Sequence, residues 1–270
     1  MTNDTGSSPS ILFDRMREAA PLVQCIINDV AMNLAANTLL AAGASPAMVH
    51  DAEESGEFAA IANALTVNIG TLSPAGLEGM QAAVRGANGA GRPWVLDPVA
   101  HFATAFRRRA VAALLALRPS IIRGNASEIM ALAGAQSSGR GVDSGDTVEQ
   151  AEQAARGLAK AQNAIVAVTG TTDFVTDGSR AAHIHGGSAL MPRITAMGCA
   201  LTCLVGAFAA AAPDTPFDAS VGALATFAVA GSTAAEDARG PGSFVVHFLD
   251  ALHALDANTL ETRAQIDIQG

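Results

Sequence analysis

The chain has 270 residues, half of them hydrophobic, and a formal net charge of −9 at pH 7. This length and apolar content suffice for one large core, so we expect a single α/β domain over residues 1–270, with a helix and a flexible start within residues 1–20. The negative charge argues against nucleic acid as a partner, because such binding depends on clustered lysine and arginine.

The sequence shows neither a targeting signal nor a cysteine motif. No basic segment followed by an apolar run opens it, and no uninterrupted apolar stretch reaches membrane-spanning length, so we expect a cytoplasmic protein without a membrane partner. Cys25, Cys199 and Cys203 lack metal-binding spacing and cannot all pair, which favours reduced thiols and disfavours zinc. The one basic cluster, residues 107–109, is interpreted as a solvated helix face.

Short apolar runs alternate with stretches of helical periodicity through the first two thirds of the chain. The predicted strands are Leu22–Ile27, Pro46–His50, Leu65–Ile69, Trp94–Leu96, Ile121–Ile122 and Ile165–Thr169. The predicted helices are Asp29–Ala42, Pro74–Ala90, Thr104–Leu117 and Ala126–Ala133. This rhythm is typical of a mostly parallel sheet with helices on both faces.

The pattern changes in the last third of the chain. Within residues 174–180, Asp177-Gly178 lies between two extended runs and predicts a hairpin, hence an antiparallel edge of the sheet. His183 and His185 alternate on the strand that follows and have no third ligand nearby, so we interpret them as surface or packed histidines. The remaining predicted helices are Cys199–Ala212, Phe217–Arg239 and Ser243–Leu255.

Polar residues follow several of the predicted strands, where ligands bind in open α/β sheets. Gly70-Thr71 follows the third strand and Asp97 follows the fourth. Arg123 follows the fifth strand, and Thr169 is the last residue of the sixth. Each residue also has an ordinary structural explanation, such as a turn cap or a surface ion pair. Their joint placement favours magnesium and a nucleoside triphosphate.

A turn of small residues at positions 195–198 precedes Cys199 and an apolar helix. The amides at a helix N-terminus attract anions, and the same field lowers the pKa of a cysteine. This site is therefore a candidate for holding a phosphoryl group beside a reactive thiol. The alternative is that Gly198 only permits a tight turn and Cys199 is a small buried residue.

Glu128 has two equally acceptable interpretations. Residues 125–128, Asn-Ala-Ser-Glu, have the spacing of a capping box, in which Glu128 serves its own helix. The alternative places its carboxylate near a metal ion, opposite Asp97. Two common nucleotide motifs are excluded: the only lysine is Lys160, so there is no P-loop, and no Gly-x-Gly-x-x-Gly follows the first strand.

Ordered blocks between about residues 21 and 212 carry a family resemblance. They comprise residues 32–37, 43–48, 68–72, 95–99, 122–129, 139–144, 168–170 and 198–200. Through these blocks the chain resembles the hydroxyethylthiazole kinases of thiamine salvage, which have a ribokinase-like fold. The resemblance implies transfer of the γ-phosphoryl group of ATP, with Mg²⁺, to the hydroxyl of 4-methyl-5-(2-hydroxyethyl)thiazole. It also implies a homotrimer with active sites at the subunit interfaces.

The resemblance assigns roles to individual residues. Cys199 matches the catalytic position beside the acceptor hydroxyl, where many ribokinase-like enzymes have an aspartate base. Asp97 and Glu128 match the acids on the magnesium side. The remaining matches are Arg123, Thr169 and Gly198 for ATP, and Asn28, Met48 and Ala196 for the acceptor.

The chain departs from the family pattern at three places. Ala196 stands where a glycine is usual, Asp29 follows Asn28 where an uncharged residue is usual, and residues 100–102 replace a glycine-rich stretch. We expect these changes to adjust the acceptor pocket and to preserve the reaction. Two alternatives are a related alcohol kinase acting on a pyrimidine or a pyridoxal-like ring, and a binding protein without turnover.

Overall fold

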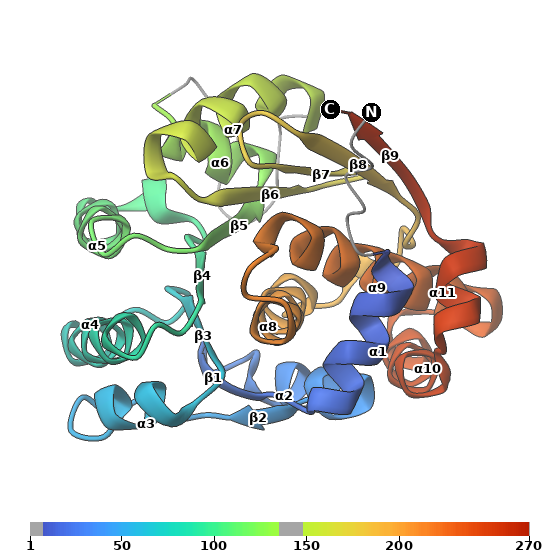
Figure 1. Ribbon diagram of the computed structural model, residues 1–270, viewed down its shortest axis with the longest axis horizontal. Helices are drawn as coiled ribbons and strands as arrows, with labels where there is room; N and C mark the ends of the chain where they lie inside the picture. The colour runs from blue at the N-terminus through green and yellow to red at the C-terminus, as the bar shows by residue number, and fades with distance from the viewer. Residues whose placement is uncertain (1–7, 135–147, 270) are drawn as a thin grey trace.

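The computed structural model describes residues 8–134 and 148–269 and shows strands joined into one sheet (Figure 1). The strand order in this described part is β2-β1-β3-β4-β5-β6-β7-β8-β9, with parallel pairing from β2 to β6 and antiparallel pairing from β6 to β9. The strands are β1 (Leu22–Ile26), β2 (Ser45–Ala47), β3 (Ala64–Asn68), β4 (Trp94–Asp97), β5 (Ile121–Asn125), β6 (Ile165–Thr169), β7 (Asp173–Thr176), β8 (Ala181–His185) and β9 (Gln265–Gln269).

Helices cover both faces of this sheet (Figure 1). One face carries α3 (Ser55–Ile61), α4 (Pro74–Gly89), α5 (Ala105–Leu115), α6 (Ala126–Leu132) and α7 (Val148–Gln162). The other face carries α1 (Pro9–Ala19), α2 (Met32–Ala42), α8 (Met197–Ala211), α9 (Pro216–Asp237), α10 (Pro241–Ala254) and α11 (Ala257–Arg263). Short 3-10 turns lie at His101–Ala103 and Met191–Arg193.

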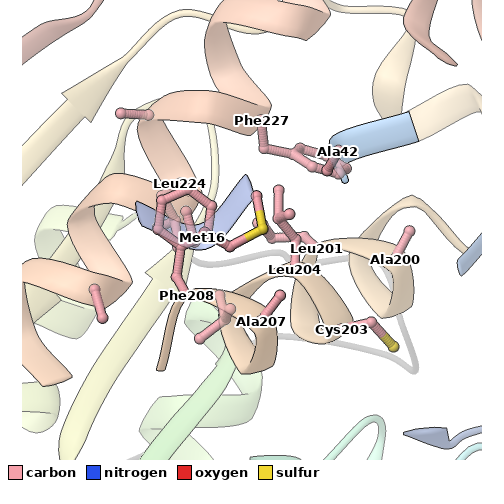
Figure 2. Close-up of a cluster of buried hydrophobic side chains, with 14 of the residues drawn as sticks. Met16, Ala42, Ala200, Leu201, Cys203, Leu204, Ala207, Phe208, Leu224 and Phe227 are labelled. Atoms are coloured by element: carbon pink, nitrogen blue, oxygen red, sulfur yellow. The ribbon is translucent and has the colours of Figure 1, made fainter. Parts of the chain in front are cut away.

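The largest apolar cluster is centred on α8, which is buried along most of its length. Figure 2 shows Leu201, Leu204 and Phe208 of this helix beside side chains of α9 and α1. A helix that is apolar on all sides must be enclosed by other elements. The sequence of α8 therefore fixes it in the interior, with its N-terminus directed at the edge of the sheet where the strands end.

The predicted α/β class, parallel sheet, flanking helices and antiparallel edge are all confirmed. The predicted N-terminal helix is present as α1, while residues 1–7 and the sequence block 139–144 lie outside the described residues. Four elements were not predicted from the sequence: the helices α3, α7 and α11 and the strand β9. None of the helices in the described ranges has the length and apolar character needed to span a bilayer.

Two of the predicted boundaries are wrong because side chains replace backbone pairing. The strand expected at Pro46–His50 is Ser45–Ala47, since the Gln24 side chain donates to the carbonyl of Val49, 2.9 Å away. The first strand ends at Ile26, since the amide of Ile27 donates to Nε2 of His50. The chain after β2 therefore leaves the sheet early and forms a loop beside the end of β1.

The hairpin predicted at Asp177-Gly178 joins β7 to β8, and β9 adds a further antiparallel strand beyond it. Gly178 has a φ of +94°, and its backbone lies against the stem of Lys160, the exposed lysine near the end of α7. His183 and His185 contact Glu152 and Asp267 through their Nε2 atoms. These contacts agree with their interpretation as surface or packed histidines.

Candidate functional site

The carboxyl ends of the central strands and the N-terminus of α8 form one polar edge. The parallel register places Asn68 at the end of β3 beside Asp97 at the end of β4, and Asn125 of β5 beside Thr169 of β6. Because these pairs lie at the same level of the sheet, the residues that follow the strands in sequence meet in space. The predicted convergence of polar residues at this edge is present.

Cys199 lies in the first turn of α8, half-buried, with two asparagine side chains directed at its sulfur. Nδ2 of Asn28 lies 3.0 Å from Sγ, and Nδ2 of Asn68 lies 3.5 Å away. Asn28 also donates to Oδ1 of Asn68, which accepts the amide of Gly70 as well. The thiol is thus held by a small network from three separate segments of the chain.

The pKa of the Cys199 thiol is raised to about 12, chiefly by burial and then by the negative charge of Asp97. The hydrogen bond from Asn28 and the charge of Arg123 oppose this shift. The expectation that the helix N-terminus lowers this pKa is wrong for the ligand-free protein, because desolvation outweighs the favourable field. Cys199 is therefore a protonated thiol at neutral pH.

Asp97 and Arg123 form a buried ion pair at the centre of the site. Nη1 of Arg123 lies 3.6 Å from Oδ2 of Asp97, and the same carboxylate oxygen accepts a hydrogen bond from Oγ1 of Thr202 at 2.9 Å. Thr202 is fully buried on α8. It was not identified from the sequence, although its position four residues after Gly198 places it on the same face of the helix.

Arg123 lies across the N-terminus of α8 and reaches β6. Its Nη2 donates to Oγ1 of Thr169 at 2.5 Å. A Cβ atom added to Gly198 would come within 2.7 Å of Nη1, so only glycine lets the guanidinium approach the helix terminus. A cation, a hydroxyl and helix amides therefore share one small region, which is the composition of an anion-binding site.

Glu128 is both a helix cap and a neighbour of Asp97. Oε2 accepts the amide of Asn125, completing the predicted capping box, and Oε1 accepts the amide of Ala100 at 2.9 Å. Burial raises the pKa of Glu128 to about 7, and the charge of Asp97 contributes to the same shift. The cap thus fixes the Glu128 carboxylate within electrostatic range of Asp97, and the two interpretations of Glu128 are compatible.

Two alanines at this edge have left-handed backbone conformations. Ala196, the N-cap of α8, has φ 71°, and Ala100, in the loop after β4, has φ 49°. Residues other than glycine rarely adopt this left-handed backbone conformation, because their Cβ atom clashes with the backbone. Both positions belong to the departures noted in the sequence, so the chain keeps a backbone suited to glycine while carrying alanine.

Two predicted positions are placed differently from this central group. Met48 lies in the loop after the edge strand β2 and is half-buried against the same apolar cluster as Ala196 and Cys199. Arg107, expected on a solvated face, instead donates to backbone carbonyls after β3 and β4. The local sequence around Arg107 gives no sign of these partners, which are distant along the chain.

Among the residues that the structure describes, no group of three or more His, Cys, Asp or Glu side chains is arranged to hold a metal ion. Asp97 and Glu128 are two buried acids within electrostatic range of each other at this site. Magnesium commonly uses one or two carboxylates and completes its octahedral shell with substrate phosphates and water. The carboxylates of Asp97 and Glu128 fit such an ion, because Mg²⁺ prefers oxygen ligands.

Comparisons with known proteins agree on one family. Residues 13–258 match the hydroxyethylthiazole kinase family. Among curated proteins, a hydroxyethylthiazole kinase of Rhizobium johnstonii is 69% identical over 262 residues, covering 97% of this chain and 98% of the relative. One from Cereibacter sphaeroides (strain KD131) is 65% identical over 255 residues, covering 94% and 97%.

Solved structures extend this comparison to the fold. The structure of a hydroxyethylthiazole kinase protein from Pyrococcus horikoshii superposes with a TM-score of 0.89 at 39% identity, covering 97% of this chain and 99% of that one. A pyridoxal kinase from Staphylococcus aureus has a TM-score of 0.64 at 17% identity, covering 93% and 99%. At that identity the second likeness concerns the fold alone, which is ribokinase-like.

Proposed function

The chain belongs to the hydroxyethylthiazole kinase family, and on this premise we propose how the residues at the strand ends divide the work of its reaction. The activity is phosphorylation of the hydroxyl of hydroxyethylthiazole in thiamine salvage, with ATP as the donor. The observation that carries the proposal is the meeting of Asp97, Arg123 and Cys199 at the N-terminus of α8.

Arg123, Thr169 and the amides at the start of α8 form the ATP side of the site. The guanidinium neutralises phosphate charge, and its contact with Thr169 fixes its direction. Gly198 keeps the helix terminus open toward Arg123, so a phosphoryl group reaches both positive groups at once. Phosphoryl transfer depends mainly on positioning and charge neutralisation, which this arrangement supplies.

Asp97 and Glu128 are the residues that would hold Mg²⁺. When bound, the ion neutralises phosphate charge and orients the transferring group. Thr202 fixes the carboxylate of Asp97 by a hydrogen bond, while the cap of α6 fixes Glu128. Since both oxygens of Glu128 already accept backbone amides, we propose that this acid acts through a water molecule and Asp97 more directly.

Cys199, Asn28 and Asn68 form the acceptor side. Because the thiol is protonated at neutral pH, it places the acceptor hydroxyl beside the ATP side and does not withdraw its proton in the ground state. The two asparagine amides hold the sulfur in position. Oδ1 of Asn28 is buried without a hydrogen-bond partner and is a candidate acceptor for a substrate donor.

Ala196 and Met48 complete this acceptor side in our proposal. Both pack on the apolar cluster that supports Cys199, and their side chains suit the apolar part of a thiazole ring. We propose further that the protein is a homotrimer in which a neighbouring subunit closes the acceptor pocket. The family resemblance supports this assembly.

The first experiment is to measure ADP release from ATP and Mg²⁺, with and without the thiazole alcohol, for the wild type and Cys199→Ala. We expect thiazole-dependent turnover in the wild type and a lower rate in the variant, because the acceptor loses its positioning thiol. The same assay is run with pyridoxal and with pyrimidine alcohols as acceptors, to test the alternative substrates. A folded wild type that binds ATP but releases no thiazole-dependent ADP would contradict the proposal.

A further inference from the structure

Arg107 joins two loops at the edge of the sheet. It is half-buried near the start of α5, and its Nη1 donates to the carbonyl of Ile69 and to that of Val99, both at 2.9 Å. Its Nη2 donates to the carbonyl of Gly70. One guanidinium thus bonds to three backbone carbonyls on two segments that are about thirty residues apart in sequence.

The first of these segments, residues 69–71, follows β3 and is called the acceptor loop here. A Cβ atom added to Gly70 would lie 2.3 Å from Cβ of Asn28, so the loop is packed directly against that side chain. Oγ1 of Thr71 accepts the amide of Asp29. The acceptor loop therefore sets the position of Asn28, which donates to the sulfur of Cys199.

The second segment, residues 98–100, follows β4 and is called the acid loop. It begins directly after Asp97, and its Ala100 amide donates to Oε1 of Glu128. Ala100 has a left-handed backbone, so this loop is held in a conformation that its sequence disfavours. An external contact such as Arg107 to Val99 helps to maintain it.

We propose that Arg107 is a positioning residue for phosphoryl transfer, which fixes the acceptor loop relative to the acid loop. This inference rests on the function proposed above. These contacts require a planar group with several donors, because one side chain donates to three carbonyls on two loops. Lysine at this position keeps the charge but lacks the fork, so we expect it to replace arginine poorly.

The consequence is kinetic. Loss of Arg107 lets the acceptor and the acids drift relative to one another, and a displacement on the order of 1 Å lowers turnover by up to about 100-fold. Among the described residues, the hydrogen bonds of this guanidinium go to Ile69, Gly70 and Val99 and not to Arg123, Thr169 or Gly198, which form the ATP side, so ATP binding is expected to change little. The effect should therefore divide unequally between the kinetic constants.

The test compares Arg107→Met and Arg107→Lys with the wild type, using Arg109→Met as the matched control. Arg109 is exposed on the same helix, and its replacement by methionine removes the same charge. For both Arg107 variants we expect kcat with the thiazole alcohol to fall about 10- to 100-fold, with KM for ATP within about twofold of the wild type. Hydrogen exchange should rise at the amides of Gly70 and Ala100 and stay unchanged in β1.

Several outcomes overturn the inference. Arg107→Met with kinetic constants and exchange rates like those of Arg109→Met would show that the contacts are not used. Full activity in Arg107→Lys would show that charge alone matters. Exchange that rises throughout the sheet, with activity lost in proportion to unfolded protein, would assign Arg107 to general stability. Absent wild-type turnover would instead contradict the proposed function, and hydrogen exchange at the two loops would then decide the inference.

Discussion

At the scale of single residues, Ala196 carries a conformational cost at the start of α8. A left-handed backbone costs an L-residue about 1–2 kcal/mol, whereas glycine gives up roughly 0.5–1 kcal/mol of chain entropy on folding. We therefore expect Ala196→Gly to raise the free energy of unfolding by up to about 1 kcal/mol. Urea denaturation of the wild type and the variant measures this difference in the free energy of unfolding. Ala209→Gly, at a helical position of α8, should lose about 1 kcal/mol or more, and a loss of that size in Ala196→Gly would refute the prediction.

Gly198 is a residue whose replacement should affect activity more than stability. The added methyl of Gly198→Ala meets the end of the Arg123 side chain, which is able to move aside, but the guanidinium then leaves the helix terminus. We expect KM for ATP to rise or kcat to fall by about tenfold or more, with little change in melting temperature. Gly157→Ala on α7, where a Cβ atom meets open space, is the control that should stay active. Equal activity of the two variants would contradict this prediction.

The Cys199 thiol should react slowly with alkylating reagents. Because its pKa is raised to about 12, the thiolate fraction at neutral pH is far below that of an ordinary cysteine. Cys25 and Cys203 are fully buried, so peptide mass spectrometry reports on Cys199. We expect the rate of iodoacetamide modification in the ligand-free protein to keep rising with pH across the alkaline range. A plateau near pH 8.5, about the pKa of a free cysteine, would be inconsistent with this geometry.

The meeting of polar residues near the strand ends could be predicted from the sequence, and contacts between residues far apart in sequence could not. Asp97, Arg123 and Thr169 could be predicted to lie near one another, because the parallel sheet brings strand ends together. Thr202 and Arg107 were missed, since their partners are set by packing and not by local pattern. The direction of the Cys199 pKa shift was also missed, because desolvation depends on burial.

At the scale of elements, the turn between β7 and β8 depends on Gly178. Its φ of +94° is unfavourable for other residues, and a Cβ atom would lie 2.6 Å from Cγ of Lys160. Lys160 is flexible, so the backbone term dominates, and we expect Gly178→Ala to lower the free energy of unfolding by about 1–2 kcal/mol. Ser179→Ala, at the next and exposed position, serves as control. Thermal unfolding of both compares them, and equal stability would contradict the prediction.

The elements that were predicted share strong periodicity or clear punctuation. Helices closed by glycine and strands of continuous apolar residues were found, with errors of a few residues at their ends. The C-terminal strand β9 was missed because four of its five residues are exposed and, among the described strands, only β8 pairs with it. Its conformation comes from its neighbour, since it lacks a buried face of its own.

At the scale of the whole molecule, the proposed trimer should form through the α2 side of the protein. Val30, just before α2, and Leu40, on it, are large apolar side chains that are 69% and 59% exposed, and we expect this interface to bury them. We expect wild-type mass by light scattering to be three times that of one chain, and Leu40→Glu to reduce it and raise KM for the thiazole alcohol. Ile61→Glu, an exposed apolar position on α3, should remain trimeric. A monomeric wild type with full activity would refute the assembly.

Lys160 gives the chain a single internal primary amine, since no other lysine occurs in the sequence. It lies near the C-terminal end of α7, the helix that leads into the start of β6. The candidate site lies at the opposite end of β6, around Thr169. Amine-directed coupling to a sensor surface or a fluorophore therefore attaches at one defined internal point, besides the terminus, and leaves the substrate edge facing solution.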